Sequence, residues 1–351
     1  MVLTGLAVGG ALGFAMQRGR FCVTGAFRDV WIGRNTRWIT AFLIVIAVQS
    51  VGIFALDALG VITLSSGPLA PLATIAGAFI FGFAIVLAGG CATGTFYRSS
   101  EGLIGSWFAL ICYAGAAAMM KGGVFGDFTA AARAQTIEVT TIHDTLGISP
   151  WWLVGGLVLA VGYAAARHLA AEPKLATLPA RRRGLAHLLF ERPWHAFATA
   201  VVIGVIAIIA WPLSTAAGRP AGLGITTPSA NALTFLVTGD IELVDWGVFL
   251  IAGILLGAFI AAKASGEFRL RVPDATTMVR SISGGLLMGV GAALAGGCTI
   301  GNAMVNTAQF SYQGWLSFGF MVLGTGAATH LFILRHRPTA TRTQQPSLAG
   351  V

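Results

Sequence analysis

Long apolar runs alternate along this chain with short polar segments. A helix that crosses a bilayer needs about 20 consecutive apolar residues, so we read each run of about 17–25 such residues as a span. The pattern predicts an all-α polytopic membrane protein with about nine transmembrane helices. The predicted spans cover residues 2–17, 37–59, 70–90, 103–120, 150–170, 194–212, 243–265, 276–297 and 313–334.

Four segments between these spans are too short to cross a membrane. Non-helical backbone at membrane depth is tolerated only where it is buried in protein or lines a water-filled cavity. We therefore expect short re-entrant half-helices that dip toward the centre of the molecule. These segments cover residues 19–31, 92–101, 226–238 and 299–310.

The composition agrees with a membrane protein. Of the 351 residues, 56% are hydrophobic and 10% are charged, whereas a soluble domain carries about 25% charged residues. No charged segment precedes the first apolar run, so residues 2–17 are interpreted as a span and not as a signal peptide. The net charge of +9 is therefore a matter of topology and membrane lipid, and no nucleic-acid partner is expected.

The positive charges fall almost entirely on one side of the predicted topology. With the N-terminus outside, all but three of the 22 lysines and arginines lie in cytoplasmic segments. The three exceptions are Lys121, Arg133 and Arg219. This positive-inside bias predicts a periplasmic N-terminus and a cytoplasmic C-terminus.

The spans group into two membrane units. Residues 1–170 form the first repeat with a connecting span, and residues 194–334 form the second repeat. A basic cytoplasmic loop at 171–193 joins them, and residues 335–351, rich in Thr, Gln, Pro and Arg, are predicted to be a disordered cytoplasmic tail.

An internal repeat supports this division. The stretch Gly77–Gly94 aligns with Gly284–Gly301, and both stretches contain Leu-Ala-Gly-Gly-Cys. In the predicted topology the span before Cys91 runs inward and the span before Cys298 runs outward. The two halves would then form an inverted-topology repeat, an arrangement common in transporters.

A second alignment pairs residues of the first span, and of the turn after it, with residues of the span at 243–265 and of the turn after that span. It matches Gly10, Ala11, Ala15, Gly19 and Phe21 with Gly257, Ala258, Ala262, Gly266 and Phe268. Its continuation makes Arg269 the counterpart of Cys22, so this thiol is not duplicated.

The four cysteines show neither a CxxC pair nor metal-ligand spacing, and the six histidines do not cluster. Free thiols are expected, with no metal and no cofactor. Cys22, Cys91 and Cys298 stand at predicted helix breaks, which favours a role in function over packing. Cys112 lies in mid-span, where a free cysteine usually packs as a small apolar residue.

Three separated motifs resemble signatures of the YeeE/YedE family. They are GRFC-x-x-GAFRD from Gly19, LAGGCATGTFYR-x-x-EG from Leu87, and LAGGCTIGN from Leu294. The resemblance extends from about residue 5 to residue 334. It implies a bacterial inner-membrane protein that takes up thiosulfate, with relatives linked to selenium metabolism.

The same resemblance implies an hourglass-like fold with nine spanning helices and short central helices. It also implies three pore-lining cysteines, which map onto Cys22, Cys91 and Cys298. Some relatives act with a small cytoplasmic sulfur-carrier protein, which is therefore a possible partner here.

The chemistry of these residues suits a small dianion. Moving one ion into a medium of low dielectric constant costs on the order of 20 kcal/mol, and half-helix N-termini offset part of this with free N–H groups. The glycines Gly90 and Gly297 would expose such amides beside the thiols. Our hypothesis is that neutral thiols, which are weak hydrogen-bond donors, hold the anion in turn and release it again.

Several further residues are secondary candidates for the substrate path, each with a structural alternative. Thr226 and Thr227 would line the outer path, or Thr227 only caps a helix that begins with proline. Arg20 and Arg269, like Arg28, Arg98 and Arg271, would gather the anion inside, or only reflect topology. Asn302 and Asn306 would face the pore, or join helices.

Two alternatives to thiosulfate uptake remain open from the sequence. One is transport of another sulfur or selenium compound, which the same thiols would serve. The other is a membrane thiol–disulfide oxidoreductase. That activity needs a paired and accessible cysteine couple, which the spacing does not provide.

Overall fold

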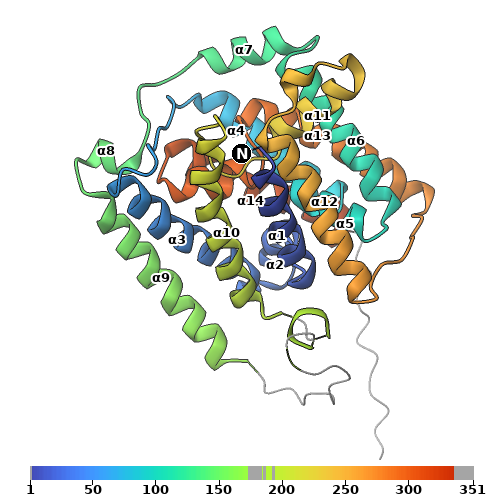
Figure 1. The fold of residues 1–351 in the computed structure, drawn as a ribbon, viewed down its shortest axis with the longest axis horizontal. Helices are drawn as coiled ribbons and strands as arrows, with labels where there is room; N and C mark the ends of the chain where they lie inside the picture. Colours follow the sequence, from blue (N-terminus) through green and yellow to red (C-terminus); the bar gives the residue numbers. More distant parts are fainter. Residues whose placement is uncertain (1, 173–183, 185–186, 192–193, 336–351) are drawn as a thin grey trace, which may run out of the picture.

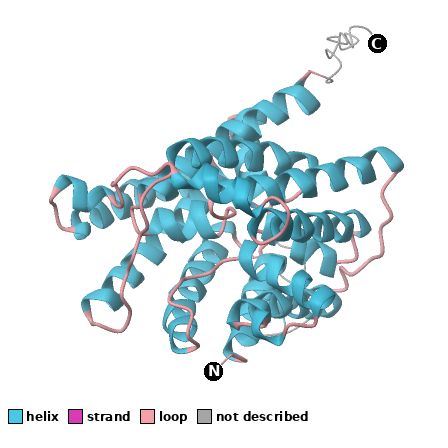
Figure 2. Ribbon diagram, turned by 90° about the horizontal axis from the view of Figure 1, so that it is seen from above, coloured by secondary structure: helices cyan, strands magenta, loops and turns pink. Residues whose placement is uncertain are grey.

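The computed structural model describes residues 2–172, 184, 187–191 and 194–335. Most of the predicted loop at 171–193, and the predicted tail after residue 335, lie outside the described residues. Within the described part the chain is built of helices and loops, without a β-strand (Figure 2).

The helices follow one another in the order shown in Figure 1. They are α1 (Thr4–Arg18), α2 (Val23–Gly33), α3 (Arg37–Ala58), α4 (Pro71–Leu87), α5 (Ala92–Ser100), α6 (Ile104–Lys121), α7 (Gly126–Ala134), α8 (Ile142–Leu146), α9 (Pro150–Ala170), η1 (His187–Glu191), α10 (Ala196–Ala216), α11 (Thr226–Thr238), η2 (Ile241–Leu243), α12 (Trp246–Ala264), α13 (Ala275–Ala295), η3 (Gly301–Asn306), α14 (Tyr312–Thr329) and η4 (His330–Leu334).

Eight segments of the described chain are long and apolar enough to cross a membrane, which confirms the polytopic all-α class. Eight of the nine predicted spans correspond to these segments. The first predicted span, 2–17, is the 15-residue helix α1, which extends only about 22 Å against a hydrocarbon core of about 30 Å. The helix ends where Gly19 and the positive-φ residue Arg20 turn the chain toward α2.

The four short predicted segments hold short helices, namely α2, α5, α11 and η3. Two breaks lie where the sequence repeats Leu-Ala-Gly-Gly-Cys. Gly89 (φ +70°) ends the turn after α4, and Gly296 (φ +79°) caps α13. Both backbone conformations favour glycine because a Cβ is strained there. The repeated glycines therefore let the chain leave one helix and start the next.

Helices α4 and α13 pack against each other in opposite directions. A Cβ on Gly77 would meet the backbone of Ala295, and a Cβ on Gly284 would meet the backbone of Ala88. Under the alignment of the repeat, these two contacts are equivalent. Other helix pairs follow the same pattern. Helix α6 packs on α13 as α14 packs on α4, and α1 packs on α12 as α10 packs on α3.

The second sequence alignment does not fit an inverted pair. Helices α1 and α12 run in the same direction, because Gly5, Gly9 and Gly13 contact Trp246, Leu250 and Ile254 in turn. Two helices related by inversion across the membrane would run in opposite directions. The match of Gly10 with Gly257 instead reflects close packing, which small residues permit.

Candidate functional site

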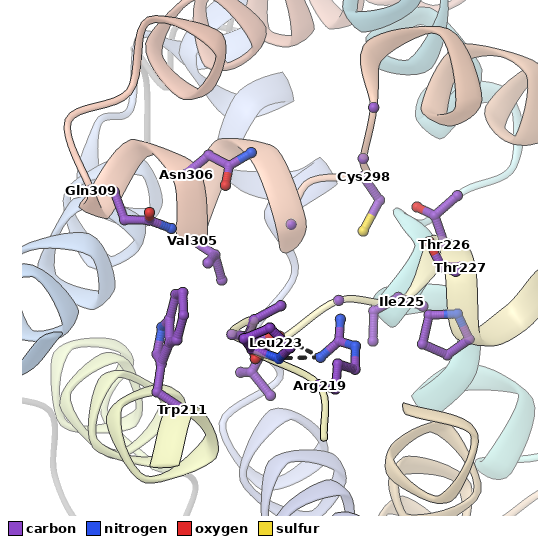
Figure 3. A pocket seen from close by; sticks show the side chains of 18 of the residues that line it. Trp211, Arg219, Leu223, Ile225, Thr226, Thr227, Cys298, Val305, Asn306 and Gln309 are labelled. Carbon is purple, nitrogen blue, oxygen red and sulfur yellow. Dashed lines mark hydrogen bonds between the residues drawn. The ribbon is translucent and has the colours of Figure 1, made fainter. Parts of the chain in front are cut away.

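A cavity of about 210 Å³ opens at the end of α13 and at the start of α11. We call it the vestibule. Figure 3 shows that the Cys298 sulfur and the Arg219 guanidinium both point into this space. Its walls come from the α10–α11 loop and the first residues of α11 (219–228), from the break at 296–298 and from one side of η3. The predicted path residues Thr226, Thr227, Gly297 and Cys298 all line it.

Arg219 is fixed in the vestibule by its own loop. Its Nη1 donates to the carbonyl of Gly222 at 2.8 Å and to Oγ of Ser214 at 3.2 Å. Burial lowers the pKa of Arg219, and Asp245 opposes this shift. A guanidinium still carries its charge at neutral pH, so the vestibule holds a cation that is only partly solvated.

Two further cations lie near the vestibule, Lys121 close to Arg219 and Arg133 close to Lys121. Lys121 donates to Oγ1 of Thr227 and interacts electrostatically with both Arg133 and Arg219. Arg133 donates to the carbonyl of Leu294 at 2.8 Å and lines a neighbouring cavity of about 400 Å³. No Asp or Glu lines either of these two cavities in the described part of the chain. The region therefore attracts anions.

These three cations are the same three that the sequence placed alone on one side of the membrane, and none was predicted as a site residue. Their convergence depends on tertiary structure, because α6, α7 and the α10–α11 loop supply one each. The sequence did contain one signal for them. The positive-inside rule leaves few basic residues on the periplasmic side, so each of the three predicted to lie there is a candidate for a role in function.

Cys298 lies at the inner end of the vestibule and is 1% exposed. Its thiol interacts with the hydroxyl of Tyr113. That hydroxyl also donates to Oγ1 of Thr226 at 2.9 Å, so Thr226 joins the thiol to the vestibule wall. The structural alternative for Thr227, a side-chain cap on α11, is not what the structure shows, because Ile225 occupies the N-cap.

Asn302 holds the second break together. Its Nδ2 donates to the carbonyls of Ala295 at 2.7 Å and Gly297 at 3.3 Å, and its Oδ1 accepts from Asn306 and Gln313. Since Asn302 is fully buried and both ends of its amide are used, its geometry favours the helix-joining alternative over direct contact with substrate.

Cys91 is completely buried at the N-cap of α5. Its Sγ accepts from the backbone N–H of Gly94 at 3.4 Å, and it follows Gly90 in the first break. The thiol interacts with Cys22, with Cys298 and with the side chain of Thr299. Cys91 therefore lies within electrostatic range of both other path cysteines.

Cys22 is partly exposed at the N-cap of α2. Its Sγ accepts from the N–H of Gly25 at 3.4 Å and faces Nη2 of Arg98 at 3.5 Å. Arg98 also donates to the carbonyl of Gly89 and interacts with the side chain of Tyr97. We call this group, with Cys22, the Arg98 mouth. It closes the end of the thiol row opposite the vestibule.

Carboxylates surround the arginines beside the Arg98 mouth. Arg20 is 68% exposed and pairs with Glu267 at 3.2 Å, and Arg18 pairs with the same carboxylate at 3.5 Å. Gln17 donates to Glu267 and to Glu101. Arg269, the predicted counterpart of Cys22, contacts this group of residues through its backbone. Its N–H donates to the carbonyl of Glu101 at 3.1 Å.

The described residues contain no group of three His, Cys, Asp or Glu side chains placed to hold a metal ion. All four cysteines are free, and Cys112 lies part-exposed within α6. The arrangement offers weak donors in a row between a cationic cavity and an arginine. It defines a multi-pass membrane protein with thiols at the breaks between its helices.

Comparison with known proteins identifies the family. The model of a family described as sulphur transport matches residues 18–327. The chain is 52% identical to the thiosulfate transporter TsuA of Escherichia coli K12 over 337 residues, covering 95% of this chain and 96% of that protein. It is 33% identical to TsuA of Spirochaeta thermophila over 338 residues, covering 92% and 97%.

A shorter match links the chain to the probable transporter YedE of Escherichia coli, with 43% identity over 108 residues, or 30% of this chain and 26% of that one. The chain therefore belongs to the sulphur-transport family, YeeE/YedE, as its motifs predicted. It is a transporter and not an enzyme, since its close relatives are named transporters.

Proposed function

We propose that this protein imports thiosulfate across a bacterial inner membrane and passes the anion along three neutral thiols. The substrate follows from the two long relatives named thiosulfate transporters. The observation that carries the route is the position of the Cys91 thiol, which is fully buried and interacts with both Cys298 and Cys22.

The positive-inside bias supports an orientation with the vestibule facing the periplasm. Arg219, Lys121 and Arg133 would then collect a dianion from outside, where focused positive potential raises its local concentration. At Cys298 and Cys91 the anion meets thiols and helix N-terminal amides, which bind it weakly enough to let it leave. Arg98 receives it at the cytoplasmic end, where a small sulfur-carrier protein would accept it.

The exchange of helix contacts supports an inverted repeat in which α1 corresponds to α10, α2 to α11, α3 to α12, α4 to α13 and α6 to α14. In this proposal the counterpart of Cys22 is Ile225, because these residues cap α2 and α11. The repeat thus places a thiol at one end of the route and an apolar residue beside Thr226 at the other.

Uptake of labelled thiosulfate by cells that lack their own thiosulfate transporters tests this function. Cys91→Ala and Cys298→Ala should each abolish uptake, whereas Cys112→Ala, the matched control in α6, should transport normally. Normal uptake by both path variants would disprove the thiol route. Competition by selenite, sulfite and sulfate distinguishes thiosulfate from another sulfur or selenium substrate, and uptake that persists under strong reductant excludes a disulfide cycle.

A further inference from the structure

Each of the three path cysteines is followed within two residues by a buried threonine whose hydroxyl has no hydrogen-bond partner. They are Thr24 after Cys22, Thr93 after Cys91 and Thr299 after Cys298. Their residues are 3%, 0% and 0% exposed. An unsatisfied buried hydroxyl costs about 1–3 kcal/mol, so three of them within two residues of the three thiols in the sequence call for a physical reason.

Elsewhere in the described chain a threonine hydroxyl in a helix usually donates to the carbonyl four residues earlier. Thr95 donates to Cys91, Thr199 to His195 and Thr325 to Met321 in this way. Thr24 and Thr93 are the second residues of α2 and α5, so the carbonyl four residues earlier belongs to the preceding turn. For Thr93 that carbonyl is Gly89, which accepts from Arg98.

Thr299 extends the pattern across the two breaks. It follows Cys298, yet its side chain lies against the thiol of Cys91, without making a hydrogen bond of ordinary geometry. A hydroxyl from one break therefore faces the sulfur of the other. One thiol and one hydroxyl therefore lie within reach of each other at this point.

Thiosulfate has a matching pair of ends, one soft terminal sulfur and three oxygens. We propose that Thr24, Thr93 and Thr299 are substrate-contacting residues, which donate to the oxygens of the anion while the neighbouring thiol contacts its terminal sulfur. This proposal rests on the proposed function and adds a basis for specificity. Sulfate lacks the soft end, and an anion without oxygens leaves the hydroxyls unpaired, a situation that gives strong discrimination.

The test replaces each threonine with valine, which keeps the shape and removes the hydroxyl, and with serine, which keeps the hydroxyl. Thr93→Val and Thr299→Val should each raise the KM for labelled thiosulfate about tenfold, the effect of one lost hydrogen bond to a charged ligand. Thr93→Ser and Thr299→Ser should stay within about twofold of the parent.

Thr329→Val is the matched control, because Thr329 in α14 is equally buried and equally without a partner but lies away from the thiols in sequence. It should leave KM unchanged. Unchanged KM in both valine variants of Thr93 and Thr299, or equal losses in valine and serine variants, would overturn the proposal. If Cys91→Ala abolishes uptake while the valine variants are normal, only this inference fails; if Cys91→Ala and Cys298→Ala also transport normally, the thiol route fails with it.

Discussion

The vestibule and the Arg98 mouth lie at opposite ends of the thiol row and differ in how their positive charge is balanced. The vestibule is lined by Arg219 without a carboxylate, and Lys121 and Arg133 stand close by. Near the Arg98 mouth, Glu101 and Glu267 accompany the arginines. Asp245 interacts with Arg219 from outside the lining of the vestibule, whereas Glu267 pairs directly with Arg18 and Arg20. The vestibule is therefore the less balanced end, which favours capture of an anion there and its release at the Arg98 mouth.

Among the charged residues of the two ends, the largest expected effect comes from Arg98, which supports both the thiol and the break. Arg98→Ala removes its hydrogen bonds to the Gly89 carbonyl and to the Cys22 sulfur, each worth about 1.5–3 kcal/mol for a charged donor. Thiosulfate uptake should fall by about 100-fold or more. Arg98→Lys, which keeps the charge but loses the planar fork, should retain part of the activity, and wild-type uptake by the alanine variant would refute a role for Arg98.

A smaller effect should separate the two ends by their response to salt. Arg219→Gln removes a vestibule charge and should raise the KM for thiosulfate about tenfold at low ionic strength, with the difference shrinking at about 0.5 M salt. Arg20→Gln is the matched variant at the other end. Because Arg20 is exposed and paired with Glu267, its KM should change by less than about twofold. Equal effects of the two substitutions would remove the contrast between the ends.

The smallest effect concerns the stability of the carboxylate cluster. Burial raises the pKa of Glu101, so the folded protein holds this proton more tightly than the unfolded chain. The stability linked to this group is therefore present at low pH and lost as pH rises through the raised pKa. Glu101→Gln should raise the Tm of the purified protein by about 1–2 °C at pH 8, with no gain at pH 4. A gain that does not depend on pH would point to packing instead.

The sequence predicted most of the fold because the bilayer imposes a strong length rule on apolar runs. Spans and short helices lie where the hydropathy pattern put them, and the repeated glycines mark the breaks. The pairing of helices within the repeat was harder to predict. The sequence alignment paired Gly10 with Gly257 as equivalent positions of a repeat, yet these glycines contact each other between two parallel helices. Similar glycine patterns arise both in repeats and in closely packed helix pairs, so the pattern alone does not distinguish them.

The candidate site was predictable in its thiols and not in its charges. Cys22, Cys91 and Cys298 could be found because each stands at a break in an apolar pattern. Arg133 and Arg219 could not, because a short helix (α7) and a loop bring them to this region, and no hydropathy pattern places either. Asn302 was named from its position after Cys298, but only its four hydrogen-bond partners reveal that it holds the turn in place.

The glycine contacts between α4 and α13 have a consequence for speed. At Gly77 and Gly284 the two helices approach so closely that their backbones are in contact. No side chains separate the helices at these points, so a sliding motion between them would cause backbone clashes. The two breaks follow directly after the C-terminal ends of α4 and α13, so both are anchored to this closely packed helix pair. Large rocking motions take microseconds to milliseconds, whereas side chains turn within nanoseconds or less when exposed. If the walls of the route stay fixed in this way, thiosulfate would pass at rates closer to those of a channel than to those of a rocking carrier.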